Sequence, residues 1–184
     1  TSGVNNTLIG SLAGDALTDA DHNVAIGYLA LSADTLGSRS IAIGFGTLDA
    51  QNFTTATDSY NIGIGYTAGG AITTGVDNTL LGGLAGDALT DADRNTALGR
   101  SALGADTLGS RAVAVGFGAL QTQNFTTATD NYNVGVGYNA GAAITTGVQN
   151  TLIGSLSGDA LTTGLNNVAV GMRSLTADTL GFNT

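Results

Sequence analysis

The chain lacks cysteine, lysine and glutamate, and each absence narrows what it can be. Without cysteine it has no disulfides, no thiolate metal ligands and no cysteine nucleophile. All 14 acidic residues are aspartate and all five basic residues are arginine, so strong helix formers are missing, while turn-forming glycine, threonine, asparagine and aspartate abound. No apolar run reaches the length of a membrane span and no secretory leader is visible, so we expect no membrane insertion. These absences predict a chain without helices.

The charge is strongly negative, with a net value of −9 at pH 7. Nucleic acids and anionic membranes reward clustered positive charge, so the sequence argues against both as partners. Arg39 and Arg111 occupy equivalent positions after the sequence DTLGS, and each is expected either to pair with a nearby aspartate or to be solvated. The arginines are too scattered along the chain to form a patch.

A long internal repeat organises the sequence. The opening TSGVNNTLIG returns as TTGVDNTLLG from Thr73 and as TTGVQNTLIG from Thr145. The copies are residues 1–72, 73–144 and a partial third, 145–184. We therefore treat residues 1–184 as a single repetitive segment.

A shorter unit lies inside the long repeat, marked by a brief apolar run that ends in glycine, as in NVAIG and NVGVG. Counted from one closing glycine to the next, the spacings are 17, 17, 21 and 17, and this pattern recurs. The four additional residues fall in QNFTTATDSYN, which predicts a loop that bulges from one unit in four. The closing glycines are Gly10, Gly27, Gly44, Gly65, Gly82, Gly99, Gly116, Gly137, Gly154 and Gly171.

Each apolar run alternates in the way of a short strand. Val24 and Ile26 share one face, which we expect to point into the core together with Val113 and its neighbours, while Ala25 points to the other face. Three residues after each closing glycine stands alanine, serine or threonine. A small residue at a fixed place in every unit predicts a crowded interior.

A unit this short buries no apolar face alone, so successive units must stack. The predicted fold is all-β: a parallel β-solenoid of ten coils. At about 4.8 Å between neighbouring strands, ten coils make a rod roughly 48 Å long.

The motif resembles the glycine-ended repeats in the heads of trimeric autotransporter adhesins, and it is similar to repeats of phage tail-fibre-like proteins. The nearest matches are NVAIGYLAL at 23–31, NTALGRSAL at 95–103 and NVGVGYNAG at 133–141. The resemblance implies a left-handed β-roll, assembled side by side into a homotrimer, with a stalk or receptor-contacting role.

Two other solenoid classes fit less well. Left-handed hexapeptide helices, many of them acyltransferases, need an aliphatic residue every six positions, whereas the apolar-glycine signature occurs only once in each unit. Calcium-binding rolls need GGxGxD at period nine, and nothing in the chain matches that pattern.

The sequence DALTDADHN offers the best candidate metal ligands, because aspartate and asparagine oxygens suit Ca²⁺. The candidate ligands are Asp15, Asp19, Asp21 and Asn23, with Asp87, Asp91, Asp93 and Asn95 in the second copy. The third copy keeps only Asp159, which favours a solvated turn, so we expect no metal and no cofactor. His22 stands where other copies have Arg94 and Asn166, and no nucleophile motif accompanies it, so we expect no catalysis.

Aromatic residues flank the four-residue insertion in both full copies: Phe53 and Tyr60, then Phe125 and Tyr132. They form either a contact loop for a neighbouring chain or a glycan, or an anchor that pins the loop onto its own coil. Threonine is plentiful, but we expect it not to recur at one position in every coil, which weighs against ice binding.

These observations together favour a structural or adhesive shaft segment of an extracellular fibre, on a cell or virion surface, and not an enzyme. The expected partners are further copies of the chain, in a homotrimer or as end-to-end fibre neighbours, and a cell-surface glycan or protein receptor. A self-assembling extracellular filament subunit and an ice-binding solenoid are the alternatives.

Overall fold

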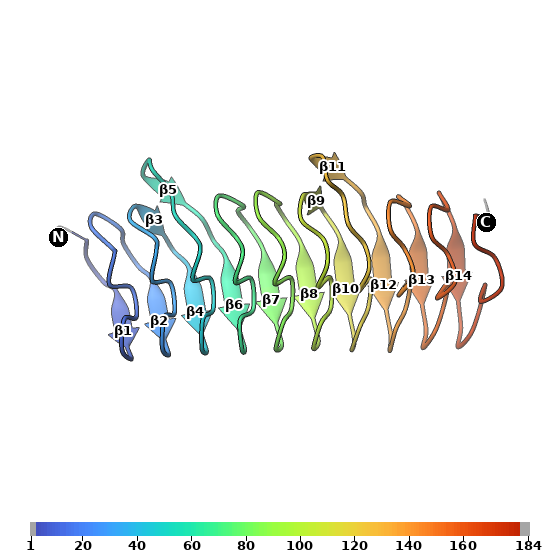
Figure 1. Ribbon diagram of the computed structural model, residues 1–184, viewed down its shortest axis with the longest axis horizontal. Coiled ribbons are helices and arrows are strands. Elements are labelled where there is room, and N and C mark those ends of the chain that lie inside the picture. The colour runs from blue at the N-terminus through green and yellow to red at the C-terminus, as the bar shows by residue number, and fades with distance from the viewer. Residues whose placement is uncertain (1–2, 181–184) are drawn as a thin grey trace.

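The computed structural model describes residues 3–180, and these residues form fourteen short strands and no helix. Figure 1 shows them as a regular stack of loops that runs from the N-terminus to the C-terminus. We number the coils 1 to 10 by their closing glycines. One strand from each coil joins a ten-stranded sheet: β1 (Thr7–Ile9), β2 (Val24–Ile26), β4 (Ile41–Ile43), β6 (Ile62–Ile64), β7 (Thr79–Leu81), β8 (Thr96–Leu98), β10 (Val113–Val115), β12 (Val134–Val136), β13 (Thr151–Ile153) and β14 (Val168–Val170).

Every pair of neighbours in this sheet is parallel and in register. Val24 pairs with Ile41, and Ile26 pairs with Ile43. Backbone hydrogen bonds run from coil to coil on both sides of the strand, for example from Val24 N to Ser40 O at 2.9 Å. The predicted parallel β-solenoid of about ten coils is therefore confirmed. Each coil contributes one strand to a single large sheet, whereas each coil of a hexapeptide helix contributes one strand to each of three sheets.

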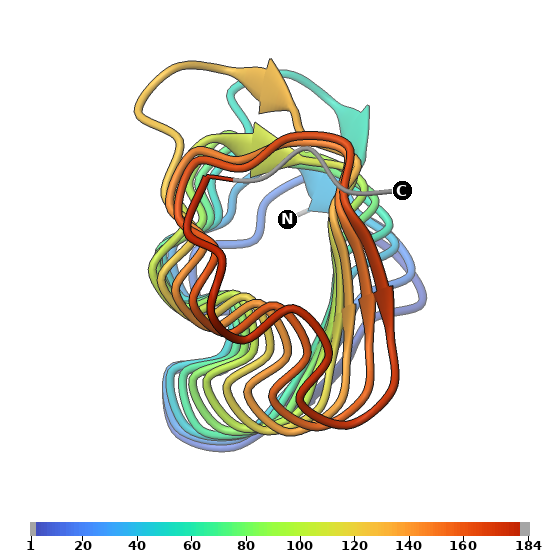
Figure 2. The ribbon, with the colours of Figure 1, turned by 90° about the vertical axis from the view of Figure 1, so that its right-hand side faces the viewer.

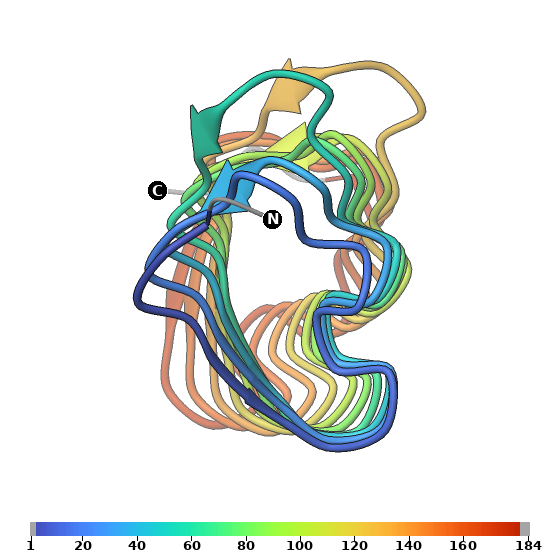
Figure 3. The ribbon, with the colours of Figure 1, turned by 90° about the vertical axis from the view of Figure 1, so that its left-hand side faces the viewer.

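Two further sheets have two strands each, and in each of them one strand belongs to a loop that leaves the regular stack. They pair β3 (Gly37–Ser38) with β5 (Thr57–Asp58), and β9 (Gly109–Ser110) with β11 (Thr129–Asp130). Figures 2 and 3, which look along the stack, show the loops that carry β5 and β11 protruding from the outline shared by the other coils. The prediction of a bulge in one coil of every four is confirmed.

The prediction that Ile26 and Val113 face the core is wrong. The middle residue of each strand points inward, so that Ala25 and Ala114 are fully buried, while Ile26 and Val113 are half-buried on the outer face. Alternation identifies which residues share a face, but it leaves open which face is the interior. The interior is narrow next to the strand, and a small central residue fits there better than a β-branched one.

Leucine and isoleucine side chains from the far side of the coils fill the interior, and their placement compensates for the size of the residue at the strand centre. In coil 5 the strand centre is Leu80, and six residues later comes Gly86, where a Cβ would lie only 2.8 Å from the Leu80 Cδ2. In coil 6 the centre is Ala97, and the corresponding position is the fully buried Leu103. Small residues three positions after the closing glycine, such as Ala85, are also fully buried, which confirms the crowded interior.

The closing glycines satisfy two backbone constraints at once. Gly99 has φ +138°, a conformation that side chains with L chirality rarely adopt. A Cβ added there would also lie 2.4 Å from the carbonyl oxygen of Gly116 in the next coil. Consecutive coils therefore approach at these glycines as closely as their backbones allow.

A ladder of buried asparagines links the coils inside the solenoid. The Asn78 backbone N–H donates to the Asn61 Oδ1 at 3.0 Å, and the Asn78 Oδ1 accepts from the Asn95 N–H, also at 3.0 Å. The Asn78 Nδ2 donates to the carbonyl of Ala92 at 2.7 Å. Each asparagine thus satisfies backbone groups that would otherwise be buried without partners.

The ladder is interrupted in coil 3, where Ser40 replaces asparagine, and a second buried pair takes its place. The Gln51 Nε2 donates to the Asp34 Oδ2 at 2.6 Å and to the Ser40 hydroxyl at 2.9 Å, while the Gln51 Oε1 accepts from the Asn61 Nδ2 at 2.9 Å. Asp34 and Gln51 are fully buried. The network explains why the repeat spans four coils and not one. The second copy uses Asp106, Gln123 and Asn133 in the same way.

The four-coil period leads to a prediction about deletions. Removing residues 73–144 joins coil 4 to a coil of the type that normally follows it, so all buried pairs are kept and we expect one cooperative thermal transition. Removing residues 24–40 deletes one coil and takes Asp34 with it. Gln51 and the Phe53 N–H then lose a buried partner, at about 1–3 kcal/mol for each unsatisfied group.

The measurement is thermal melting followed by circular dichroism. We expect the shorter deletion to show an additional unfolding phase at low temperature, and the longer deletion to show none. The reverse pattern would mean that the asparagine and Asp34–Gln51 contacts do not set the order of the coils.

Candidate functional site

The outer face of the ten-stranded sheet carries no charged residue in any coil. Its two columns are the first and third residues of each strand, and we call them the apolar face. The first column contains Thr7, Val24, Ile41, Ile62, Thr79, Thr96, Val113, Val134, Thr151 and Val168. The second contains Ile9, Ile26, Ile43, Ile64, Leu81, Leu98, Val115, Val136, Ile153 and Val170.

An aromatic ladder extends this face along one side, at the position after the closing glycine. Phe45 lies between Tyr28 and Tyr66, with ring centroids 5.4 Å away from each. Phe117 and Tyr138 repeat the stack at 5.6 Å. Because the stacked rings contact one another through their faces, their edges are left to the solvent.

The apolar face and the aromatic ladder hold most of the exposed apolar surface of the molecule. Eleven of the 18 large hydrophobic residues that are exposed lie on them, and Met172 occupies the ladder position in coil 10. The ten strands lie about 4.8 Å apart, and the apolar face together with the aromatic ladder is about four residues wide. The projected area of this surface is therefore roughly 600 Å². That is the upper limit of patches on ordinary monomers, and it approaches the roughly 800 Å² that each partner buries in a stable interface.

The insertion forms a flap in coils 3 and 7, which we define as residues 52–58 and 124–130. Phe53 is only 5% exposed, and its N–H donates to the buried Asp34 Oδ1 at 3.2 Å. Phe53 and its copy Phe125 are therefore buried and pin the flaps onto their own coils. Tyr60 and Tyr132 do not pin the flaps, because they are 51% and 49% exposed.

An ion pair and an aromatic ring meet at the base of each flap. The Arg39 Nε lies 2.9 Å from the Asp58 Oδ1, and the guanidinium lies over the Tyr60 ring at 5.9 Å from its centroid. The Tyr60 hydroxyl donates to the Asp58 Oδ2 at 3.5 Å. The second flap repeats these contacts with Arg111, Asp130 and Tyr132, and Asp130 holds the pKa of the Arg111 guanidinium above its ordinary value. Of the two alternatives that the sequence left open for Arg39 and Arg111, pairing and solvation, the structure shows pairing, in each case with an aspartate of the next coil.

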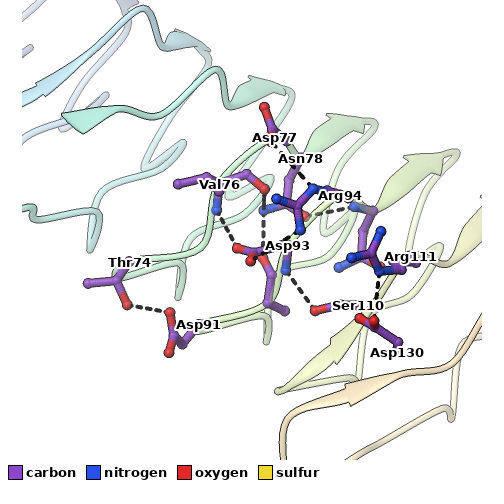
Figure 4. A network of polar contacts seen from close by, with 12 residues as sticks. Thr74, Val76, Asp77, Asn78, Asp91, Asp93, Arg94, Ser110, Arg111 and Asp130 are labelled. Atoms are coloured by element: carbon purple, nitrogen blue, oxygen red, sulfur yellow. Dashed lines mark hydrogen bonds and ion pairs between the residues drawn. The ribbon is translucent and has the colours of Figure 1, made fainter.

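The candidate calcium ligands do not converge. Figure 4 shows that the Asp93 Oδ1 accepts from the Val76 N–H, at 2.9 Å, and that Asp91 accepts from the Thr74 hydroxyl at 2.7 Å. Asp21 accepts from the Val4 N–H at 2.7 Å in the same way. Among residues 3–180 no group of three or more acidic or histidine side chains is placed to hold a metal ion. These aspartates connect neighbouring coils.

The structure also places the remaining candidates of the sequence. His22 is exposed, and its Nε2 lies 3.2 Å from the Asn5 Nδ2 of the preceding coil.

The expectation that threonine does not recur at one position is wrong, because the position eight residues after the closing glycine holds threonine in eight of ten coils. Most of these hydroxyls donate to a carbonyl of the next coil, as Thr90 does to Thr107 O at 3.0 Å. The column comprises Thr18, Thr35, Thr73, Thr90, Thr107, Thr145, Thr162 and Thr179.

Comparisons with protein-family models, with curated proteins and with solved structures give no match for this chain. Residues 3–180 contain no helix that could cross a membrane. The function must therefore be argued from the two surfaces themselves.

Calcium removal gives a direct prediction for the acidic turns. Since Asp91 and Asp93 are occupied by hydrogen bonds within the protein, a chelator should leave the melting temperature unchanged, whereas loss of a bound ion would lower it by mass action. The comparison is a thermal melt with excess EDTA and with added Ca²⁺. A shift of many degrees between the two would contradict this account of the turns.

Asp49 supplies a prediction about pH. Burial raises the pKa of its carboxyl above the ordinary value of about 3.9, so the folded state binds the proton more tightly than the unfolded state does. The ionised carboxyl therefore destabilises the fold at neutral pH, and this cost disappears as the pH falls below about 3.9.

Replacing Asp49 by glutamine, the residue that stands at the equivalent position 121, should raise the melting temperature at pH 7 and leave it unchanged near pH 3.5, below the ordinary value of about 3.9. Asp15→Gln, at the same slot in coil 1 and exposed, is the control for simple removal of negative charge. Equal effects of the two substitutions at both pH values would refute the burial argument.

Proposed function

We propose that the chain is a structural or adhesive shaft segment of an extracellular fibre, such as a phage tail fibre or a bacterial surface adhesin. In this proposal several parallel copies associate side by side through the apolar face, most simply as a homotrimer. The observation that carries the proposal is the apolar face itself: twenty positions on ten strands without one charge, in a chain with a net charge of −9.

The distribution of charge supports association through this face. All 14 aspartates lie off the two columns, and Arg100 stands in the aromatic ladder with its guanidinium over Phe117 at 5.8 Å from the ring centroid. Burying a face of roughly 600 Å² at about 25 cal/mol per Å² yields about 15 kcal/mol per chain before the entropy cost of association. A second copy supplies a face of the same repeat length, so parallel copies match strand for strand.

The alternatives use other parts of the molecule. A filament subunit would assemble through the sheet edges at β1 and β14, and it would leave the apolar face in water. An ice-binding solenoid would use a flat threonine column, but the flaps in coils 3 and 7 interrupt the column at Asn52 and Asn124. We assign no catalytic step to the chain, and we place it outside the cell by analogy with the fibres whose repeats it resembles.

The test is a charge placed on the apolar face. Leu98 is 41% exposed in the middle of the face, and Leu98→Asp should abolish association and so give a lower melting temperature than that of the wild type. Leu12 is 45% exposed off the face, in a slot that Arg173 fills in coil 10, so Leu12→Asp is the matched control.

Light scattering over a range of concentrations measures the outcome. The wild type and Leu12→Asp should share one constant mass, and Leu98→Asp should run as a single chain. Growth of the mass with concentration would favour the filament. Identical masses for all three proteins would refute the assignment of the apolar face as the interface.

A further inference from the structure

The flaps are additions that the solenoid does not require. Eight of the ten coils close without them, and the register of the large sheet continues through coils 3 and 7 unchanged. Nevertheless the segment is nearly identical in both copies, QNFTTATDSYN and QNFTTATDNYN, although the two full copies of the long repeat differ at many other positions. An element that folding does not need calls for another explanation.

Each flap is held rigidly from below. The fully buried Asp34 accepts from the N–H groups of Gly37 and Phe53, and from the Gln51 side chain. Parallel pairing of β3 with β5 fixes Thr57 and Asp58 beside the preceding coil. A site supported in this way loses little conformational entropy when it binds a ligand.

The base of the flap presents donors, an acceptor and an aromatic ring to the solvent within one cluster. The Arg39 and Asp58 side chains are 42% and 50% exposed, and they contact each other through one guanidinium nitrogen and one carboxylate oxygen. The guanidinium carries further N–H donors, and the carboxylate carries further acceptor sites. Tyr60 adds a half-exposed ring and a hydroxyl.

We propose that this Arg39–Asp58–Tyr60 cluster, and its copy Arg111–Asp130–Tyr132, bind uncharged carbohydrate. Neighbouring sugar hydroxyls require donors and acceptors at short spacing, and the apolar C–H face of a sugar suits an aromatic ring. The ligand is uncharged because each cluster is neutral as an ion pair and the chain as a whole repels anions. A single exposed cluster of this kind binds carbohydrate weakly.

Repetition compensates for weak binding. The two clusters lie four coils apart, about 19 Å along the rod, and side-by-side copies would multiply them. A polysaccharide that spans several clusters gains affinity through effective concentration without any new contact. This inference rests on the adhesive part of the proposed function and names its ligand class.

The experiment is saturation-transfer NMR on the full chain, with irradiation of the aromatic protons. The probes are short uncharged oligosaccharides of glucose, mannose, galactose and N-acetylglucosamine, with oligogalacturonate as an acidic probe. Tyr60→Asn and Tyr132→Asn remove the rings but keep the fold, since asparagine fills the same slot at Asn5 and Asn166 with a similar positive φ. Thr55→Ala with Thr127→Ala, at the exposed flap tips, is the control.

We expect transfer to at least one uncharged probe, a signal about half as strong in either single tyrosine variant, no signal in the double variant, and the full signal in the threonine control. Absence of transfer to every uncharged probe, transfer to oligogalacturonate alone, or a signal that survives in the double variant would overturn the proposal. Light scattering on the same samples reports the assembly, so a failure of carbohydrate binding is distinguished from a failure of the shaft.

Discussion

The close approach of consecutive coils at their closing glycines is the constraint on which the rest of the molecule depends. A residue such as Gly99 combines a φ that excludes other residues with a gap in which no Cβ fits. Once the coils are locked at this point, the strands pair in register and the asparagine side chains meet the backbone of the next coil. Equivalent side chains of successive coils then align in columns along the rod.

Two different surfaces follow from this repetition. Strand alternation sends small residues such as Ala97 inward and aliphatic ones such as Leu98 outward, so the large sheet presents a continuous apolar face. The buried Asp34–Gln51 pair interrupts the asparagine ladder once in four coils and anchors a polar flap that ends shortly before the next strand of the large sheet, β6. The first surface suits other copies of the chain, and the second suits a polar ligand.

Much of the fold could be predicted from the sequence, because closing glycines and small residues recur at fixed places that only stacking explains. The position of the flap followed from four additional residues between Gly44 and Gly65, whereas for Arg39 the sequence left pairing with an aspartate and solvation as alternatives. The prediction of which strand face points into the core was wrong. Periodicity defines the two faces, whereas the volume enclosed by the far side of the coil decides which one is inside.

The asparagine ladder and the Asp34–Gln51 pair were not predicted, for a physical reason. The partners lie in neighbouring coils, far apart in sequence, and their role is to satisfy buried backbone groups that appear only when the coils stack. The asparagine before eight of the ten apolar runs was visible as part of the motif, and it was the one available signal. The threonine column was missed because it becomes visible only when positions are counted from the closing glycine of each coil.

The central claim is that the apolar face is covered by further copies of this chain. Native mass spectrometry of the unmodified protein tests it most directly. The account predicts a single species with the mass of three chains, while a species with the mass of one chain, stable at high protein concentration, would contradict it.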